Sequence, residues 1–405
     1  MSIITVSADK KYDHMDIATS FSSHSDTNLA IREAIDSLTT KVFKPQLVLA
    51  YFSEHYDVVL LRNALSEEYP DAQILACSSC QGIMTDEGYI SDQGIALWSV
   101  SDHYGAYGSA IVSTNQSPKD MARQAVLRAI ENSGRPGELP ALILLHATPG
   151  HEEEVISGIE SEVGGAVPII GGSAADDLVA GQWNLFTHHQ IAQKGVGIVV
   201  FYPSCQVSYS FHSGYASSGL SAIATRVEGR EVIELDGRPA MDVYQEWLGK
   251  TLAINDSIVS ESSLNPLGRI AGTVHDLPYF KLAHPLRVTE QRGIELFAQV
   301  NEGEVLYFME GTVERLVTRA GRVINSAYDI SRSNRLDPIG GITIYCAGCM
   351  LKVKDRMKDV AKYVNIAMHN APFVCPFTFG EQGQFVGGEN AHGNLMISAV
   401  LFHRD

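Results

Sequence analysis

The chain has 405 residues, of which 45% are hydrophobic and 19% are charged, so its composition is that of an ordinary globular protein and not of a disordered or fibrous one. Its formal net charge is -17 and it has no cluster of lysines and arginines, which argues against nucleic acid and anionic membrane surfaces as partners. No window approaches eighteen consecutive apolar residues, and the N-terminal segment lacks the pattern of a secretory signal. We therefore expect a cytoplasmic protein with no membrane-spanning segment.

The length exceeds the size at which a single hydrophobic core usually stops growing, so we expect two domains, residues 1–217 and 218–405. In the first half, helical periodicity at residues 26–38, 58–68, 119–131 and 155–163 alternates with strand patterns at 46–52, 73–76, 94–101, 107–113, 141–145 and 195–201. The link between residues 101 and 107 is too short for a crossover, which predicts that its two flanking strands pair antiparallel.

The second half repeats this mixture of helices and strands. Helical patterns occupy residues 240–248, 313–330 and 354–370, and strand patterns occupy 286–289, 293–297, 304–309, 341–345, 373–379 and 395–402. Each half also carries a Cys-x-x-Cys pair directly after a strand, which hints at a duplication. We predict an α/β (mixed α+β) fold of two domains, each with a mixed, largely antiparallel sheet packed against helices.

One stretch has the features of a binding site. Residues 168–177 read Pro-Ile-Ile-Gly-Gly-Ser-Ala-Ala-Asp-Asp, in which Gly171 and Gly172 free the end of a buried strand from any Cβ and allow a close approach. Two adjacent imidazoles, His188 and His189, follow within about twenty residues, near an apolar strand. A turn of small residues, a polar rim and an apolar wall together predict a small-molecule pocket. The alternative is a tight strand-to-helix turn beside two ordinary histidines.

Motifs of the common enzyme classes are missing. The chain has no Walker loop, and no third glycine completes a dinucleotide fingerprint after Gly195 and Gly197. The segment 171–175 has alanine where a nucleophile elbow needs its second glycine. Neither a zinc-protease HExxH nor a Cys-x-x-Cys-His haem attachment site is present. We expect a protein that is not an enzyme.

Four segments, taken in order, resemble the FIST sensory family of N-terminal and C-terminal FIST domains. They are Ala-Cys-Ser-Ser-Cys-Gln-Gly at 76–82, the double-glycine stretch at 168–177, Cys-Ala-Gly-Cys at 346–349, and 377–383 with the later Asn394. The resemblance covers the chain from about residue 26 to its end, and it departs from the family pattern at Cys349, where arginine is expected. It implies a bacterial ligand-sensing module for signal transduction.

The chain also resembles the nitric oxide sensing protein (NosP) branch of this family, as a stand-alone FIST protein with histidines after the double glycine. That branch implies non-covalent haem b, nitric oxide as the signal, and a partner in two-component signalling, which is a histidine kinase or a cyclic-di-GMP enzyme (a diguanylate cyclase or phosphodiesterase). His188, beside Phe186 on an expected strand, is the first candidate for the haem iron ligand. His189 would face the opposite side of that strand, and His212 is the next candidate.

The cysteines offer other metal chemistry. Cys375 precedes a proline, as in haem-regulatory motifs in which a thiolate binds iron, although a buried cysteine at a strand end is the commoner reading. Cys77, Cys80, Cys346 and Cys349 could supply four thiolates to one zinc ion or act as two redox pairs. Turn residues that match the family pattern are the simpler explanation for both pairs.

From these observations we predict a haem-binding nitric oxide sensor, with homo-oligomerisation left open. The alternatives are a FIST module that senses an amino acid or another small organic ligand without haem, a cysteine or zinc redox switch, and, fourth, a hydrolase built on Ser173.

Overall fold

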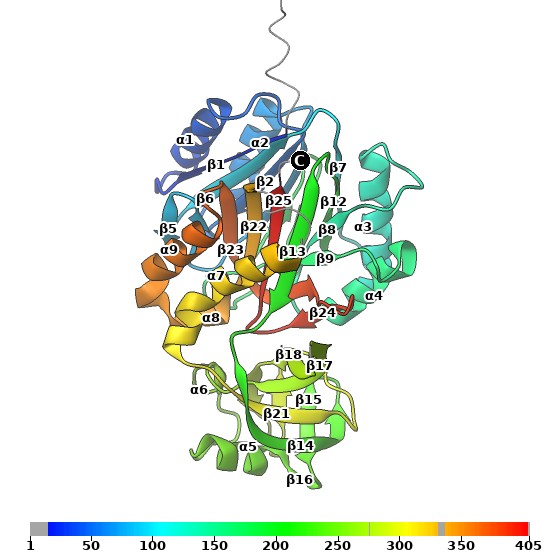
Figure 1. Cartoon of the computed structure of the whole chain (residues 1–405), viewed down its shortest axis with the longest axis vertical. Helices are drawn as coiled ribbons and strands as arrows, with labels where there is room; N and C mark the ends of the chain where they lie inside the picture. The colour runs from blue at the N-terminus through cyan, green and yellow to red at the C-terminus, as the bar shows by residue number, and fades with distance from the viewer. Residues whose placement is uncertain (1–14, 275, 331–336, 404–405) are drawn as a thin grey trace, which may run out of the picture.

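The computed structural model describes residues 15–274, 276–330 and 337–403, and these form two bodies (Figure 1). The large body contains residues 15–213, 311–330 and 337–403. The small body contains residues 216–274 and 276–310, and the chain enters it after one strand of the large body and leaves it at a helix. Within the described chain, no helix combines the length and the apolar composition needed to span a bilayer.

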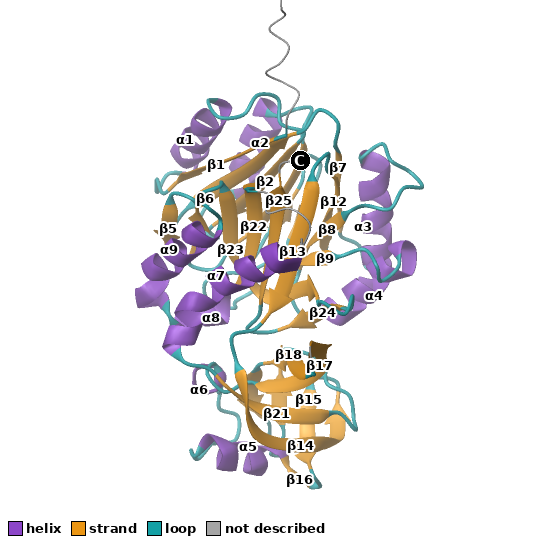
Figure 2. Cartoon of the chain, in the orientation of Figure 1, coloured by secondary structure: helices purple, strands orange, loops and turns teal. Residues whose placement is uncertain are grey.

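Two stacked sheets make up the centre of the large body (Figure 2). The first sheet has the order β1 (Asp16–Ser22), β6 (Ile95–Ser101), β2 (Leu47–Phe52), β3 (Gln73–Ser78), β10 (Leu185–Phe186) and β11 (Ile191–Ala192). The second has the order β13 (Gln206–His212), β25 (Ile397–His403), β22 (Pro338–Cys346), β23 (Phe373–Gln384), β9 (Ile169–Ser173), β8 (Leu142–Ala147), β12 (Val196–Tyr202) and β7 (Ala106–Val112). Off its path lie β4 (Gly82–Thr85), β5 (Gly88–Ser91) and β24 (Asn390–Gly393).

Strand β2 shows why these sheets are buried on both faces. Its residues alternate sides, so Leu47, Leu49 and Tyr51 join the core between the two sheets. Its other face, with Val48 and Phe52, packs against the outer helices. A fully apolar strand of this kind is typical of the middle of a sheet that is covered on both sides.

Helices cover the outer faces and complete four layers. On the first sheet lie α1 (Thr27–Thr39) and α2 (Val58–Glu68), and on the second lie α3 (Pro118–Asn132), α4 (Glu152–Val163), α7 (Val313–Ile330), α8 (Ala347–Lys352) and α9 (Met357–Ala367), with the 3-10 turn η2 (Lys354–Arg356). Side-chain caps start three of them: Asp26 accepts from Leu29, Asp57 from Val59, and Ser117 from Asp120.

The small body is built around one antiparallel sheet with its own core. Its order is β18 (Leu277–Ala283), β17 (Leu267–Val274), β21 (Val305–Glu310), β14 (Ala216–Glu228), β15 (Glu231–Leu235), β20 (Ile294–Leu296) and β19 (Pro285–Val288), with β16 (Arg238–Pro239) beside β15. Helix α5 (Ala240–Leu248) packs on this sheet through Tyr244, and the short α6 (Val259–Ser262) lies near the large body (Figure 1).

The mixed α/β class with two bodies is confirmed, but the pairing predicted across the 101–107 link is wrong. Strand β6 pairs with β1 and β2 in the first sheet, whereas β7 pairs with β12 in the second. The short link crosses between stacked sheets and does not form a hairpin. The boundary between two sequence domains at residue 217 remains a prediction. Near that position the chain enters the small body at β14, and strands β22 to β25 return to the sheet of the first half.

The two halves of the large body meet where β9 pairs antiparallel with β23. Gly171 and Gly172 lie on this line of contact. A Cβ on Gly171 would lie 1.9 Å from the Leu145 backbone oxygen, and one on Gly172 would lie 2.1 Å from the Thr378 Oγ1. The glycines therefore serve strand packing, because a real side chain cannot occupy either position without displacing a neighbouring strand.

We expect G171A to lower the free energy of unfolding by about 2–3 kcal/mol, because the added methyl collides with a main-chain oxygen that cannot rotate away. Equilibrium urea denaturation followed by tryptophan fluorescence measures this change. The matched control is G165A, whose Cβ has no neighbour closer than 3.4 Å, and it should leave the denaturation midpoint nearly unchanged. Equal midpoints for both variants would contradict the packing role of Gly171.

Candidate functional site

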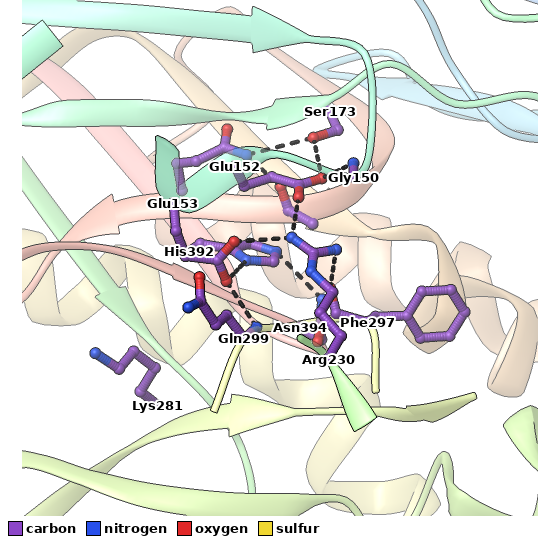
Figure 3. Close-up of polar contacts among 12 residues, drawn as sticks. Gly150, Glu152, Glu153, Ser173, Arg230, Lys281, Phe297, Gln299, His392 and Asn394 are labelled. Carbon is purple, nitrogen blue, oxygen red and sulfur yellow. Dashed lines mark hydrogen bonds and ion pairs between the residues drawn. The ribbon is translucent and has the colours of Figure 1, made fainter. Parts of the chain in front are cut away.

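A network of charged side chains joins the two bodies. Arg230, in the turn between β14 and β15 of the small body, donates through Nη2 to Glu152 at 2.7 Å and to Glu153 at 2.8 Å in the large body (Figure 3). Its Nη1 donates to the Phe297 backbone oxygen at 2.6 Å, which holds the guanidinium in place. A second ion pair between the bodies, Lys281 with Glu389 at 2.9 Å, lies nearby. These contacts fix how the small body sits on the large one.

Every oxygen of Glu152 has a partner. The carboxylate lies at the start of α4 and is buried, with 3% of its side chain exposed. Ser173 donates to its Oε1 at 2.9 Å, and the Gly150 backbone N–H donates to the same oxygen at 3.0 Å. Burial alone would raise the pKa of Glu152, but the nearby His392 and the Arg230 guanidinium lower it below its ordinary value. Ser173 of the double-glycine stretch therefore belongs to this polar network.

His392 closes the network from β24. Its Nδ1 lies 2.9 Å from the Glu153 Oε1, and because a carboxylate only accepts, this nitrogen carries the proton. Its Nε2 is 3.3 Å from the Asn394 side-chain nitrogen, which donates to it. The backbone N–H of Gln299 also donates to Glu153, at 2.9 Å. Burial would raise the pKa of Glu153, but its bonds to His392 and Arg230 bring it well below the usual range.

Beside this network lies a cavity of about 220 Å³ between the bodies. Most of its wall is apolar, and its polar groups are few. The lining residues are Pro149, Gly150, Glu152, Val179, Trp183, Arg230, Val259, His284, Phe297, Cys346, Gly348, Leu351, Phe379, Gly380 and Asn394. An apolar cavity with a few convergent polar groups at the contact of two bodies is the usual form of a small-molecule site.

His284 is an uncharged polar group in the wall of this cavity. Its Nε2 lies 3.1 Å from the Val259 backbone oxygen, so this nitrogen is the donor and Nδ1 keeps its lone pair. Burial lowers the pKa of His284 to about 4, so the ring is uncharged at neutral pH. Its Nδ1 has no hydrogen-bond partner within the described chain. A ligand with a donor group could therefore bond to it.

A family model for the FIST N domain matches residues 46–238, and one for the FIST C domain matches residues 240–384. The chain is a FIST-domain protein. It is 21% identical over 260 residues to the uncharacterized protein MJ1623 of Methanocaldococcus jannaschii, a match that covers 62% of this chain and 49% of that protein, so the chain spans about half of the relative's length.

Solved structures resemble this FIST-domain protein only distantly. A cyanuric acid hydrolase from A. caulinodans has a TM-score of 0.39 at 9% identity, with 97% of this chain and 100% of the other covered. A second cyanuric acid hydrolase structure has a TM-score of 0.37 at 9% identity, with 96% and 100% covered. Scores this low do not establish a shared fold.

The residues predicted as haem ligands lie apart from the cavity of this FIST-domain protein. His188 and His189 fall in the turn after β10, outside the strand on which they were expected, and their rings lie 5.9 Å apart. His188 Nε2 bonds to the Ala72 backbone oxygen at 2.6 Å. His212 ends β13 and contacts the Ser213 backbone oxygen at 2.9 Å. Phe186 is buried against Phe52.

The six cysteines are free thiols, and their placement does not favour a shared zinc site. Two groups of three or more metal-ligand atoms within 4.8 Å occur in the described residues, and neither includes a cysteine. Cys375 is fully buried, and burial raises the pKa of its thiol. One of the two groups is Glu152, Glu153 and His392. There the Arg230 guanidinium already forms an ion pair with each of the two carboxylates.

No sequence motif marks Glu152, Glu153, Arg230 or His392. The two glutamates begin a helix, where acidic residues are common because they suit the helix dipole. Arg230 belongs to a hairpin turn whose charges usually face water. A signal was present in the segments that resemble the family, since Ser173 and Asn394 lie in them and both bond to this network.

We expect R230Q to lower the free energy of unfolding by about 2–3 kcal/mol, since it leaves the buried Glu152 carboxylate and the half-buried Glu153 carboxylate without their cation. The expected loss is below that of a fully buried pair because 24% of the Arg230 side chain is exposed. The matched control is R238Q, which breaks the exposed pair with Glu246 and should change the denaturation midpoint little. A R230Q midpoint equal to that of R238Q would contradict the bridging role.

The same pair makes stability depend on pH. The pKa values of Glu152 and Glu153 are lower in the folded protein, so their stabilisation is present above about pH 5 and is lost as the pH falls through the folded values. We expect the difference in unfolding free energy between wild type and R230Q to stay constant above about pH 5 and to shrink steadily as the pH falls below that value. Denaturation curves at a series of pH values measure it, and a constant difference would argue against the assignment.

Proposed function

We propose that this FIST-domain protein is a sensory signalling module whose ligand binds in the cavity between the two bodies. One observation carries the proposal: both bodies line the cavity, with Trp183 and Phe379 from the large body and Val259 and Phe297 from the small one. A ligand in this position touches both bodies at once. Its binding therefore favours the arrangement of the bodies that the ligand contacts best.

The chemistry of the wall selects a small, uncharged and largely apolar organic molecule. The volume of about 220 Å³ lies below the roughly 300–1,000 Å³ of pockets that take drug-sized ligands. The two charged lining residues, Glu152 and Arg230, already neutralise each other. His284 offers one neutral acceptor. An aromatic alcohol or a heteroaromatic compound with an N–H or O–H group has matching properties.

A free amino acid fits this cavity less well. Its ammonium and carboxylate groups would each need an unpaired counter-charge, because burying an ion without a partner is strongly unfavourable. The carboxylate and the guanidinium in the wall are already occupied by Ser173, Gly150 and one another. Among the ligands predicted for a haem-free FIST module, the other small organic molecules are therefore favoured.

Haem fits the cavity poorly in this arrangement. The histidines predicted to bind iron do not line it, and of the two nearest imidazoles His392 has both nitrogens engaged. The cavity is also smaller than the pockets that usually bind drug-sized ligands, and such ligands are themselves smaller than haem. Haem and nitric oxide remain predictions from the family resemblance. Regulation of a histidine kinase or a cyclic-di-GMP enzyme is part of the same prediction. Any such partner would respond to a change in the relative arrangement of the two bodies.

A thermal-shift assay with indole, phenol and free phenylalanine tests the ligand proposal. We expect indole or phenol to raise the melting temperature of the wild type and phenylalanine to have little effect. V259W should abolish the shift by filling the cavity from the small body, whereas V305W, which places the same side chain at an exposed position, should retain it. A shift that survives in V259W would place the ligand elsewhere.

Absorption spectra separate this proposal from the haem prediction. Protein reconstituted with haemin should give no stable band near roughly 400 nm if the cavity takes an uncharged organic ligand. A strong band that shifts with nitric oxide, and that disappears in the triple variant H188A/H189A/H212A, would instead favour the haem sensor. A band that persists in the triple variant would reject those three histidines as ligands.

A further inference from the structure

Helix α7 carries a buried cation, Arg319, which forms no ion pair with a carboxylate among the described residues. Arg319 is fully buried and lies over the rings of Tyr215 and Tyr345, at 5.8 and 5.6 Å from their centres. Its Nη1 donates to the Leu395 backbone oxygen at 2.7 Å. Its Nε and Nη2 have no hydrogen-bond partner among the described residues. A guanidinium in such a place needs a nearby negative charge to compensate for lost hydration.

Two acidic groups, Glu381 and a cysteine, interact with the charge of Arg319. Burial, followed by the proximity of Cys349, raises the pKa of Glu381 well above its ordinary value. Cys349 is the other group. Burial alone would raise the pKa of its thiol, but the hydrogen bond from Cys346 and the charge of Arg319 lower it to about 6. At neutral pH the Cys349 sulfur is therefore a thiolate.

Cys346 lies between this thiolate and the cavity. It ends β22 and precedes the first residue of α8, it lines the cavity, and it is 6% exposed, whereas Cys349 is fully buried. Side chains three residues apart at the start of a helix are neighbours, which suits a disulfide. The remaining group at the pair is the Tyr215 hydroxyl, 3.7 Å from the Cys349 sulfur. A small molecule that enters the cavity therefore meets Cys346 first.

We propose that Cys346 and Cys349 form a peroxide-reactive dithiol that closes to a disulfide. The Cys349 thiolate attacks one oxygen of hydrogen peroxide, which gives a sulfenic acid and releases hydroxide. Burial raises the pKa of the Cys346 thiol well above its ordinary value, so this thiol keeps its proton until it attacks the Cys349 sulfur; a disulfide then forms and water leaves. Thiol plus thiolate plus hydrogen peroxide gives disulfide, water and hydroxide, so two electrons pass from the sulfurs to the peroxide.

The second Cys-x-x-Cys pair provides an internal comparison. Cys77 belongs to the core between the two sheets, whereas Cys80 belongs to the core under α7. Burial raises the pKa values of both thiols, and the carboxylates of Asp176 and Asp177 add to the effect at Cys80. Neither cysteine is a thiolate at neutral pH, so this pair should remain reduced under mild oxidation.

Thiol counting and peptide mass spectrometry on the reduced full-length chain test the proposal. Hydrogen peroxide at neutral pH should remove two of the six thiols, with the Cys346–Cys349 disulfide in the peptide map, and dithiothreitol should restore them. The double variant C77S/C80S should still lose two thiols, and C346S should form no disulfide. Oxidation confined to other cysteines, or sulfinic acid without a disulfide at this pair, would overturn the proposal.

The pH profile of the reaction separates the thiolate assignment from a structural role. The rate of disulfide formation should rise with a midpoint near about 6 in the wild type, well below the roughly 8.5 of an ordinary thiol. R319K keeps the charge and should keep that midpoint, whereas R319Q should move it upward. If R319Q does not fold, the wild-type profile decides alone, and a midpoint of roughly 8.5 would reject the pairing of Arg319 with Cys349.

Discussion

The antiparallel contact of β9 with β23 is the constraint on which the rest of the molecule depends. It joins residues about two hundred positions apart, and only glycine fits where β9 passes Leu145 and Thr378. Next to it, Asn390 accepts from the Ile169 backbone N–H at 2.9 Å and thereby fastens the β23–β24 hairpin to the same strand. The contact makes one sheet from the two ends of the chain. It also brings Ser173 and the end of β24 to a common edge, where the polar network forms.

That network explains how the small body can be held at a defined position on the large one. The Arg230 pairs with Glu152 and Glu153 are buried enough to be directional, although a buried ion pair adds little net stability over an apolar contact. Their effect is on geometry, since a misplaced small body would leave charges without partners. The cavity lies directly beside these bonds. A ligand there can shift the balance between two arrangements only through the difference in its affinity for them.

Much of the large body could be predicted from local pattern. Helix α2 was predicted at its observed residues, and the inward faces of α3 and α4 follow the apolar spacing read from the sequence. The residue pattern within a segment does not specify which strands become neighbours in a sheet. The link after β6 looks like a hairpin until the stacked sheets are known, because its length suits both arrangements. The return of the C-terminal strands β22, β23 and β25 to the second sheet depends on pairings of very high sequence separation.

Only some residues of the site could be predicted from the sequence, because some lie in segments of unusual composition and others look like ordinary surface charges. Ser173 and Asn394 lie in segments whose small and polar residues stand out against their surroundings, so pattern reading reaches them. Glu152 and Arg230 look like ordinary surface charges, and only the docking of one body on the other buries them. The histidines attracted attention because imidazole is a versatile ligand. Yet His188 is held by a backbone oxygen, whereas His284, which no motif marked, faces the cavity. The type of a residue suggests which ligands its side chain can bind. Its burial and its hydrogen-bond partners decide whether the side chain is available for binding.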